Sequence, residues 1–184
     1  MVRRSSYAEH VRHDEYAAYD GTGLAQLIAA GEVTRDDVLR AATSRIDAVN
    51  GHVNAVVHRV DPPADAGDPI DGPLAGVPFV TKDMDGRLAG HPASHGSRAL
   101  AGWVPDHDSE LIHRYKAAGL RIIGKTNCPE LGIMGVTEPE LHGPTRNPWN
   151  LAGAFGTEEM LLRLAPQMHE ARPWVGRLPE LSVA

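Results

Sequence analysis

Long apolar runs and cysteine are both scarce in this chain of 184 residues. No uninterrupted apolar stretch follows the N-terminal arginines, so the sequence predicts neither a signal peptide nor a membrane-spanning helix. The single cysteine, Cys128, cannot form an internal disulfide or a cysteine metal cluster, which is typical of a reducing compartment. These features together predict a cytoplasmic protein.

Positive charge is in short supply as well. The chain has 18 basic and 24 acidic residues, which gives a net charge of −6, and no run of Lys or Arg. We therefore expect no nucleic acid and no membrane surface as partner. The hydrophobic fraction of 42% over this length is sufficient for one domain with its own core.

Two helices are expected near the N-terminus. Thr22 and Thr34 are the predicted N-caps, and Gly31 and Gly51 are the predicted stops. In the second helix the apolar residues recur at helical spacing, which indicates one buried face.

Three apolar segments follow that are typical of strands, at residues 53–60, 77–83 and 120–126. A helix with Asp108 as N-cap and Gly119 as stop separates the last two segments. Strand, helix and strand in this order predict a βαβ unit, hence an α/β fold with a mixed or parallel sheet flanked by helices.

Two motifs match the sequence patterns of known sites but lack the structural context that those sites require. Gly119 to Thr126 fits the phosphate-binding pattern G-x-x-x-x-G-K-[ST], but such a loop follows a strand and opens a helix. Nucleotide binding is therefore a distant alternative. His91 and His95 have the i, i+4 spacing of two metal ligands, but Pro92 and Gly96 disfavour a helix there, so we expect no metal site.

Lys82 is the candidate catalytic residue, at the end of the apolar run in "GVPFVTKDMDG". Burial at a strand end disfavours the charged amine, and a neutral amine accepts protons. The alternative is a lysine that is neutralised by Asp83 or that reaches solvent.

Three longer segments carry a family resemblance: "GPLAGVPFVTKDMDG", "GSRALAGWVPDHDSELIHRYKAAGLRIIGKTNCPELG" and "HGPTRNPWN". They closely resemble the N-terminal part of the amidase signature family, from about Tyr19 to Asn150. The resemblance implies hydrolysis of carboxamide C–N bonds by a Ser-cisSer-Lys triad, with no metal or organic cofactor. By this resemblance Lys82 matches the catalytic lysine, which takes a proton from the bridging serine.

The sequence departs from the family after Asn150. The Gly- and Ser-rich segment that supplies both triad serines is missing, and residues 153–181 resemble the C-terminal helix and tail of family members. We therefore expect a flexible arm at 1–19, the N-terminal part of an amidase domain at 20–150, and the C-terminal end joined directly to it. In that last helix Pro166 is expected to cause a kink.

The missing segment has chemical and structural consequences. Ser94 and Ser97 are the only conceivable substitutes for the serines, so we expect a truncated amidase fold that is inactive alone. The strands at 77 and 120 are expected to have exposed edges that a protein partner or a second copy covers. The alternatives are a non-catalytic binding module or subunit, and an internally deleted reading frame whose product folds poorly.

Overall fold

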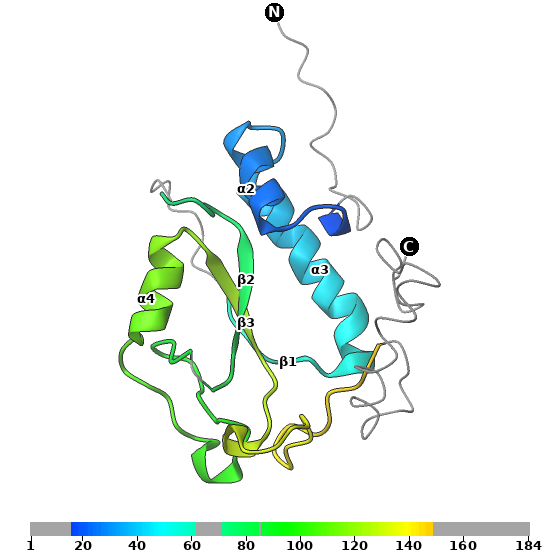
Figure 1. Ribbon diagram of the computed structural model, residues 1–184, viewed down its shortest axis with the longest axis vertical. Coiled ribbons are helices and arrows are strands. Elements are labelled where there is room, and N and C mark those ends of the chain that lie inside the picture. The colour runs from blue at the N-terminus through cyan, green and yellow to red at the C-terminus, as the bar shows by residue number, and fades with distance from the viewer. Residues whose placement is uncertain (1–15, 62–70, 85, 149–184) are drawn as a thin grey trace, which may run out of the picture.

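The computed structural model of the chain describes residues 16–61, 71–84 and 86–148. Within these ranges the order of helices and strands is that of an α/β fold (Figure 1). None of the described helices is long and apolar enough to cross a membrane. Most of the expected N-terminal arm, the expected C-terminal helix and Pro166 lie outside the described residues.

The sheet has three strands: β1 (Val56–Arg59), β2 (Pro78–Lys82) and β3 (Arg121–Thr126). Their order is β1-β3-β2, and β3 pairs antiparallel with β1 and parallel with β2. The sheet is therefore mixed, as the sequence predicts. β2 and β3 end together, because Lys82 lies opposite Thr126 in the parallel register.

Helix α3 (Arg35–Val53) begins with a capping box. The Thr34 hydroxyl accepts the N–H of Asp37 at 3.1 Å, and the Asp37 carboxylate accepts the N–H of Thr34 at 3.0 Å. The expected N-cap is confirmed, but the expected stop at Gly51 is wrong. The helix continues through this exposed glycine and ends at Asn54, whose φ of 52° is left-handed.

Helix α2 (Gly21–Ala29) begins two residues earlier than expected. Its N-cap is Asp20, whose carboxylate accepts the N–H of Gly23 at 2.7 Å. Thr22 is therefore not a cap but an exposed residue of the first turn. Aspartate caps a helix at least as well as threonine, so the neighbouring carboxylate takes the role.

Helix α4 (Glu110–Ala117) connects β2 to β3. Ser109 is its N-cap, so the expectation of Asp108 is wrong by one residue. The Asp108 carboxylate instead accepts the backbone N–H of Ala89 at 2.8 Å and fixes the preceding loop. Gly119 ends the helix as expected, because its φ of 88° favours glycine.

The core lies on both sides of the strands. Figure 1 shows α3 and α4 on opposite sides of them. The buried residues on the α4 side are Val60, Leu88, Ile112 and Ile122. Those beside α2 and α3 are Leu24, Val38 and Val77. Helix α4 therefore packs against one cluster, and α2 and α3 share the other.

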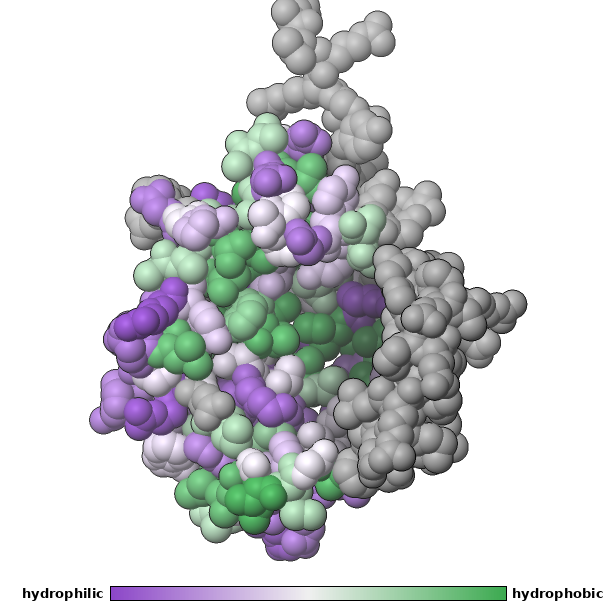
Figure 2. Space-filling view, viewed as in Figure 1, coloured by the Kyte–Doolittle hydropathy of each residue, from purple (hydrophilic) through white to green (hydrophobic). Residues whose placement is uncertain are grey.

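The sequence predicts exposed edges for both β2 and β3, but of these two only β2 lies at an edge of the sheet. Among the described residues β2 is an edge strand, whereas β3 is central and almost wholly buried, because β1 covers its other side. Downstream of β3, the side chains of Leu131, Ile133 and Met134 are 51%, 76% and 59% exposed. Figure 2 shows apolar surface at the lower end of the molecule, where the segments near residues 100 and 130 lie.

The two threonines near the helix starts allow a matched test of the caps. Thr34→Ala removes the hydroxyl of the capping box and should lower the free energy of unfolding by about 1 kcal/mol. Thr22→Ala should be near neutral, because Thr22 is an exposed residue within the first turn of α2. Urea denaturation of both variants measures the difference, and equal losses would contradict the assigned caps.

Candidate functional site

The candidate site lies where the parallel strands β2 and β3 end. Lys82 is the last residue of β2, and its side chain is exposed. Its Nζ donates a hydrogen bond to the backbone carbonyl of Asn127 at 3.2 Å. The expected burial of Lys82 is therefore wrong for the described part of the chain. The amine reaches solvent at the carboxyl edge of the sheet, where α/β folds place their functional groups.

Asp83, the next residue, points the other way. Successive side chains of an extended chain alternate between opposite faces, and the Asp83 side chain is fully buried. Its Oδ1 lies 2.8 Å from Nζ of Lys125 in β3, which is equally buried. The expected neutralisation of Lys82 by Asp83 is therefore not observed, since Asp83 is already paired with another lysine.

The surroundings of Asp83 keep it ionised. Burial by itself raises the pKa of Asp83, but contacts with His58, Lys125 and Ser94 outweigh burial and hold this pKa well below its usual range. Lys125 also donates to the carbonyl of Pro92. The site therefore contains a satisfied pair of opposite charges rather than an isolated carboxylate.

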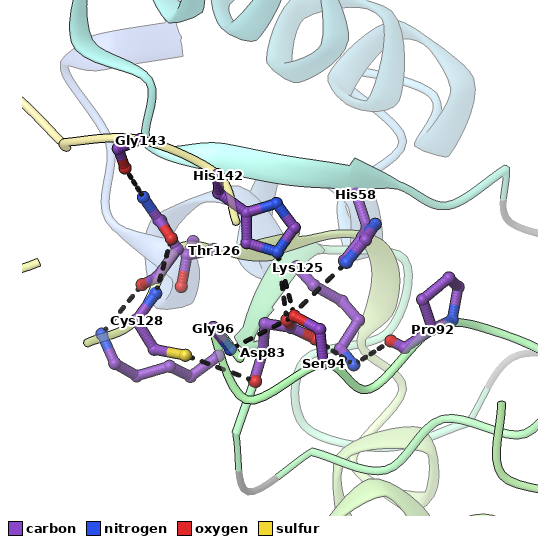
Figure 3. A network of polar contacts seen from close by, with 12 residues as sticks. His58, Asp83, Pro92, Ser94, Gly96, Lys125, Thr126, Cys128, His142 and Gly143 are labelled. Carbon is purple, nitrogen blue, oxygen red and sulfur yellow. Dashed lines mark hydrogen bonds and ion pairs between the residues drawn. The ribbon is translucent and has the colours of Figure 1, made fainter. Parts of the chain in front are cut away.

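Two histidines approach the second oxygen of Asp83 (Figure 3). The Nε2 atoms of His58 and His142 lie 3.6 Å and 3.7 Å from Oδ2. His142 Nε2 also lies 2.9 Å from the hydroxyl of Ser94, which donates to Asp83. Since that hydroxyl has one proton, His142 acts as the donor to it. Burial and the nearby His58 lower the pKa of His142, which favours a neutral ring.

Asn127 joins this region to the end of the described chain. Its side-chain amide donates to the carbonyl of Gly143 at 2.9 Å and to the hydroxyl of Thr145 at 3.0 Å. Thr145 in turn donates to the carbonyl of Asn54 at 2.8 Å. The segment that carries His142 is therefore fixed beside the strand ends.

Neither serine that the sequence singles out is a free hydroxyl. Ser94 is 1% exposed and belongs to the Asp83 network. Ser97 is 3% exposed, caps the 3-10 turn η2 (Arg98–Leu100) and donates to Glu130 at 2.8 Å. Both hydroxyls therefore have structural roles in the described chain.

The two motifs that matched only in their letters have other roles here. Lys125 of the phosphate-loop pattern lies inside β3, paired with Asp83, so it is not available to a phosphate. His95 packs its ring near Trp103, with centroids 5.9 Å apart. Sequence reasoning missed His58 and His142, because they are far apart in the chain and have no motif spacing. The structure alone brings His58 to this site, through the register that places it opposite Lys125.

Comparison with known proteins identifies the family. The family model described as Amidase matches residues 37–157. The chain is 38% identical over 140 residues to a 6-aminohexanoate-cyclic-dimer hydrolase of Paenarthrobacter ureafaciens, covering 74% of this chain. It is 42% identical over 140 residues to a glutamyl-tRNA(Gln) amidotransferase subunit of Salinispora arenicola, covering 70% of this chain. The chain therefore belongs to the amidase family.

Solved structures support the same conclusion for the fold. A structure of 6-aminohexanoate cyclic dimer hydrolase matches with a TM-score of 0.69 and 36% identity, over 74% of this chain and 30% of that one. A bacterial aryl acylamidase of the amidase signature family matches with a TM-score of 0.63 and 26% identity, over 74% and 31%. The chain spans only 28% of the length of both curated relatives, so it has a partial amidase-signature fold.

The buried ion pair gives a test of what holds the strand ends. Lys125→Met leaves the Asp83 carboxylate buried without its cation and should cost about 3–5 kcal/mol of unfolding free energy. The matched variant is Lys116→Met. The Lys116 side chain is half exposed and pairs with Asp108, so this substitution should cost no more than about 1 kcal/mol of unfolding free energy. Guanidinium denaturation measures both, and similar losses would show that the Asp83 pair is not special.

Proposed function

We propose that this chain carries the lysine-bearing part of a carboxamide hydrolase site, with Lys82 as the proton acceptor. The observation that supports this proposal is the environment of the amine. Lys82 Nζ lies at the carboxyl edge of the sheet and donates to a neutral carbonyl, that of Asn127, while the adjacent carboxylate is committed to Lys125.

We further propose that the chain does not hydrolyse amides by itself. The sequence lacks the Gly- and Ser-rich segment that carries the bridging and nucleophilic serines in the family. Its serines are Ser5, Ser6, Ser44, Ser94, Ser97, Ser109 and Ser182. Of these, Ser94, Ser97 and Ser109 are committed to hydrogen bonds within the fold. A general base without its nucleophile contributes little, because the triad acts as one unit.

The chain would then act as a subunit or binding module whose partner is a protein. Among the described residues, β2 presents an edge without a strand partner, and Leu131, Ile133 and Met134 expose apolar side chains. Edges and apolar surfaces of this kind favour association with another chain. One relative is by its name a subunit of glutamyl-tRNA(Gln) amidotransferase. The substrate of the completed site would be a small carboxamide, and the expected location stays the cytoplasm.

Amide hydrolysis tests both parts of the proposal. The purified chain should show no turnover on a panel of aliphatic and aryl carboxamides. Mixing it with the remainder of a related amidase, from the serine segment onward, should restore turnover. Lys82→Ala should then reduce the restored rate about 100-fold or more.

The control is Lys116→Ala, which alters an exposed lysine on α4 and should keep the restored rate. Turnover by the chain alone would contradict the proposed inactivity. A restored rate that does not depend on Lys82 would contradict its assigned role.

A further inference from the structure

A second cluster of reactive side chains lies close to Lys82 but has no part in the proposed hydrolysis. His58 from β1, Asp83 after β2 and His142 from the segment after β3 each offer one ligand atom. These three atoms lie within 4.8 Å of one another. Figure 3 shows both imidazole rings directed at the carboxylate of Asp83.

Two of the three distances between the ligand atoms are close to those of a first coordination sphere. Imidazole nitrogen and carboxylate oxygen bind Zn²⁺ at about 2.0–2.2 Å, so two ligands at a tetrahedral angle are about 3.4 Å apart. The Nε2 atoms of His58 and His142 lie 3.6 Å and 3.7 Å from Oδ2 of Asp83. A contraction of a few tenths of an ångström in each pair and a closer approach of the two rings would complete the geometry.

One ligand atom is unsatisfied without an ion. Nε2 of His58 is buried and has no hydrogen-bond partner in the described chain, and a buried polar atom left in this state is costly. The rings themselves leave a way in, since the side chains of His58 and His142 are 20% and 13% exposed. The rings meet edge to face, with centroids 5.2 Å apart.

The surrounding groups orient the cluster as an outer shell. Lys125 binds Oδ1 of Asp83 at 2.8 Å and thereby leaves Oδ2 for the two imidazoles. Outer-shell contacts such as that of Lys125 hold metal-binding carboxylates in place. Ser94 contacts Oδ2 of Asp83 and Nε2 of His142, the same atoms that would bind the ion, so its hydroxyl would turn away from them or itself bind the ion.

We propose that His58, Asp83 and His142 bind a divalent transition-metal ion such as Zn²⁺ through Nε2, Oδ2 and Nε2, with the Nε2 proton of His142 moved to its Nδ1. Water or the hydroxyl of Ser94 would occupy a fourth position. Because Lys125 already balances the charge of Asp83, the site has little negative charge and depends on its two imidazoles. It should therefore select Zn²⁺ or Co²⁺ and reject Mg²⁺ and Ca²⁺, which require several oxygen ligands.

Metal titration of the full chain, stripped beforehand with a chelator, tests this proposal. CoCl₂ should produce the visible absorption of four-coordinate Co²⁺, ZnCl₂ should displace it, and ZnCl₂ but not MgCl₂ should raise the melting temperature. His58→Ala and His142→Ala should each weaken Co²⁺ binding about tenfold or more. The double variant His107→Ala with His113→Ala, at two exposed positions, should bind as the unaltered chain does.

Two results would overturn the proposal. One is the absence of a Co²⁺ signal, and the other is binding that survives when His58 and His142 are both replaced, since the ion would then bind other residues. Circular dichroism of the metal-free variants checks their folding. His58→Gln and His142→Gln, which keep much of the side-chain volume, replace any alanine variant that unfolds. Lys82→Ala should retain Co²⁺ binding, which separates this site from the proposed hydrolysis.

Discussion

The buried pair of Asp83 and Lys125 is the interaction on which the carboxyl end of the sheet depends. Lys125 belongs to the central strand β3, and Asp83 continues β2 with its N–H bonded to the carbonyl of Thr126 at 2.9 Å. His58 of β1 lies opposite Lys125. The Asp83 carboxylate at the end of β2 thus gathers side chains from β1 and β3. In low dielectric a buried charge needs a partner, and Lys125 supplies one to Asp83.

The same pair determines the direction of the Lys82 side chain. Because Asp83 turns inward to meet Lys125, Lys82 must turn outward, and the two neighbours in sequence have opposite environments. In the sequence, an Asp beside a Lys suggests a salt bridge. In the structure, the aspartate is occupied elsewhere and the amine donates to the backbone carbonyl of Asn127. The proposed role as a proton acceptor rests on this separation.

Much of the fold is predictable from local patterns. The apolar runs and the strand-helix-strand order predict the mixed α/β sheet, and the T-x-x-D pattern at Thr34 marks the cap of α3. The expected stop at Gly51 failed, because one exposed glycine costs a helix only about 1 kcal/mol, which the neighbouring turns offset. The expectation of two exposed strand edges failed for β3, because the pairing of β1 with β3 depends on residues far apart in sequence.

The polar network could not be predicted from spacing. Its members lie on two strands, at the end of a third and in two loops. No sequence motif includes them all. The family resemblance points to Lys82, and the sequence presents Asp83 only as a candidate partner of that lysine. The role of Asp83 follows from its burial and from its contacts with Ser94 and His142, which the order of residues does not reveal.

Asn54, which closes α3 in a left-handed conformation, also closes the described chain on itself. Its side chain donates to the carbonyl of His142 at 2.8 Å, and the N–H of Arg146 donates to the carbonyl of Val53 at 2.8 Å. The last described segment is therefore hydrogen-bonded to the C-terminal end of α3. A change of sequence beyond residue 148 would leave both of these bonds in place, because all of their donors and acceptors lie before it.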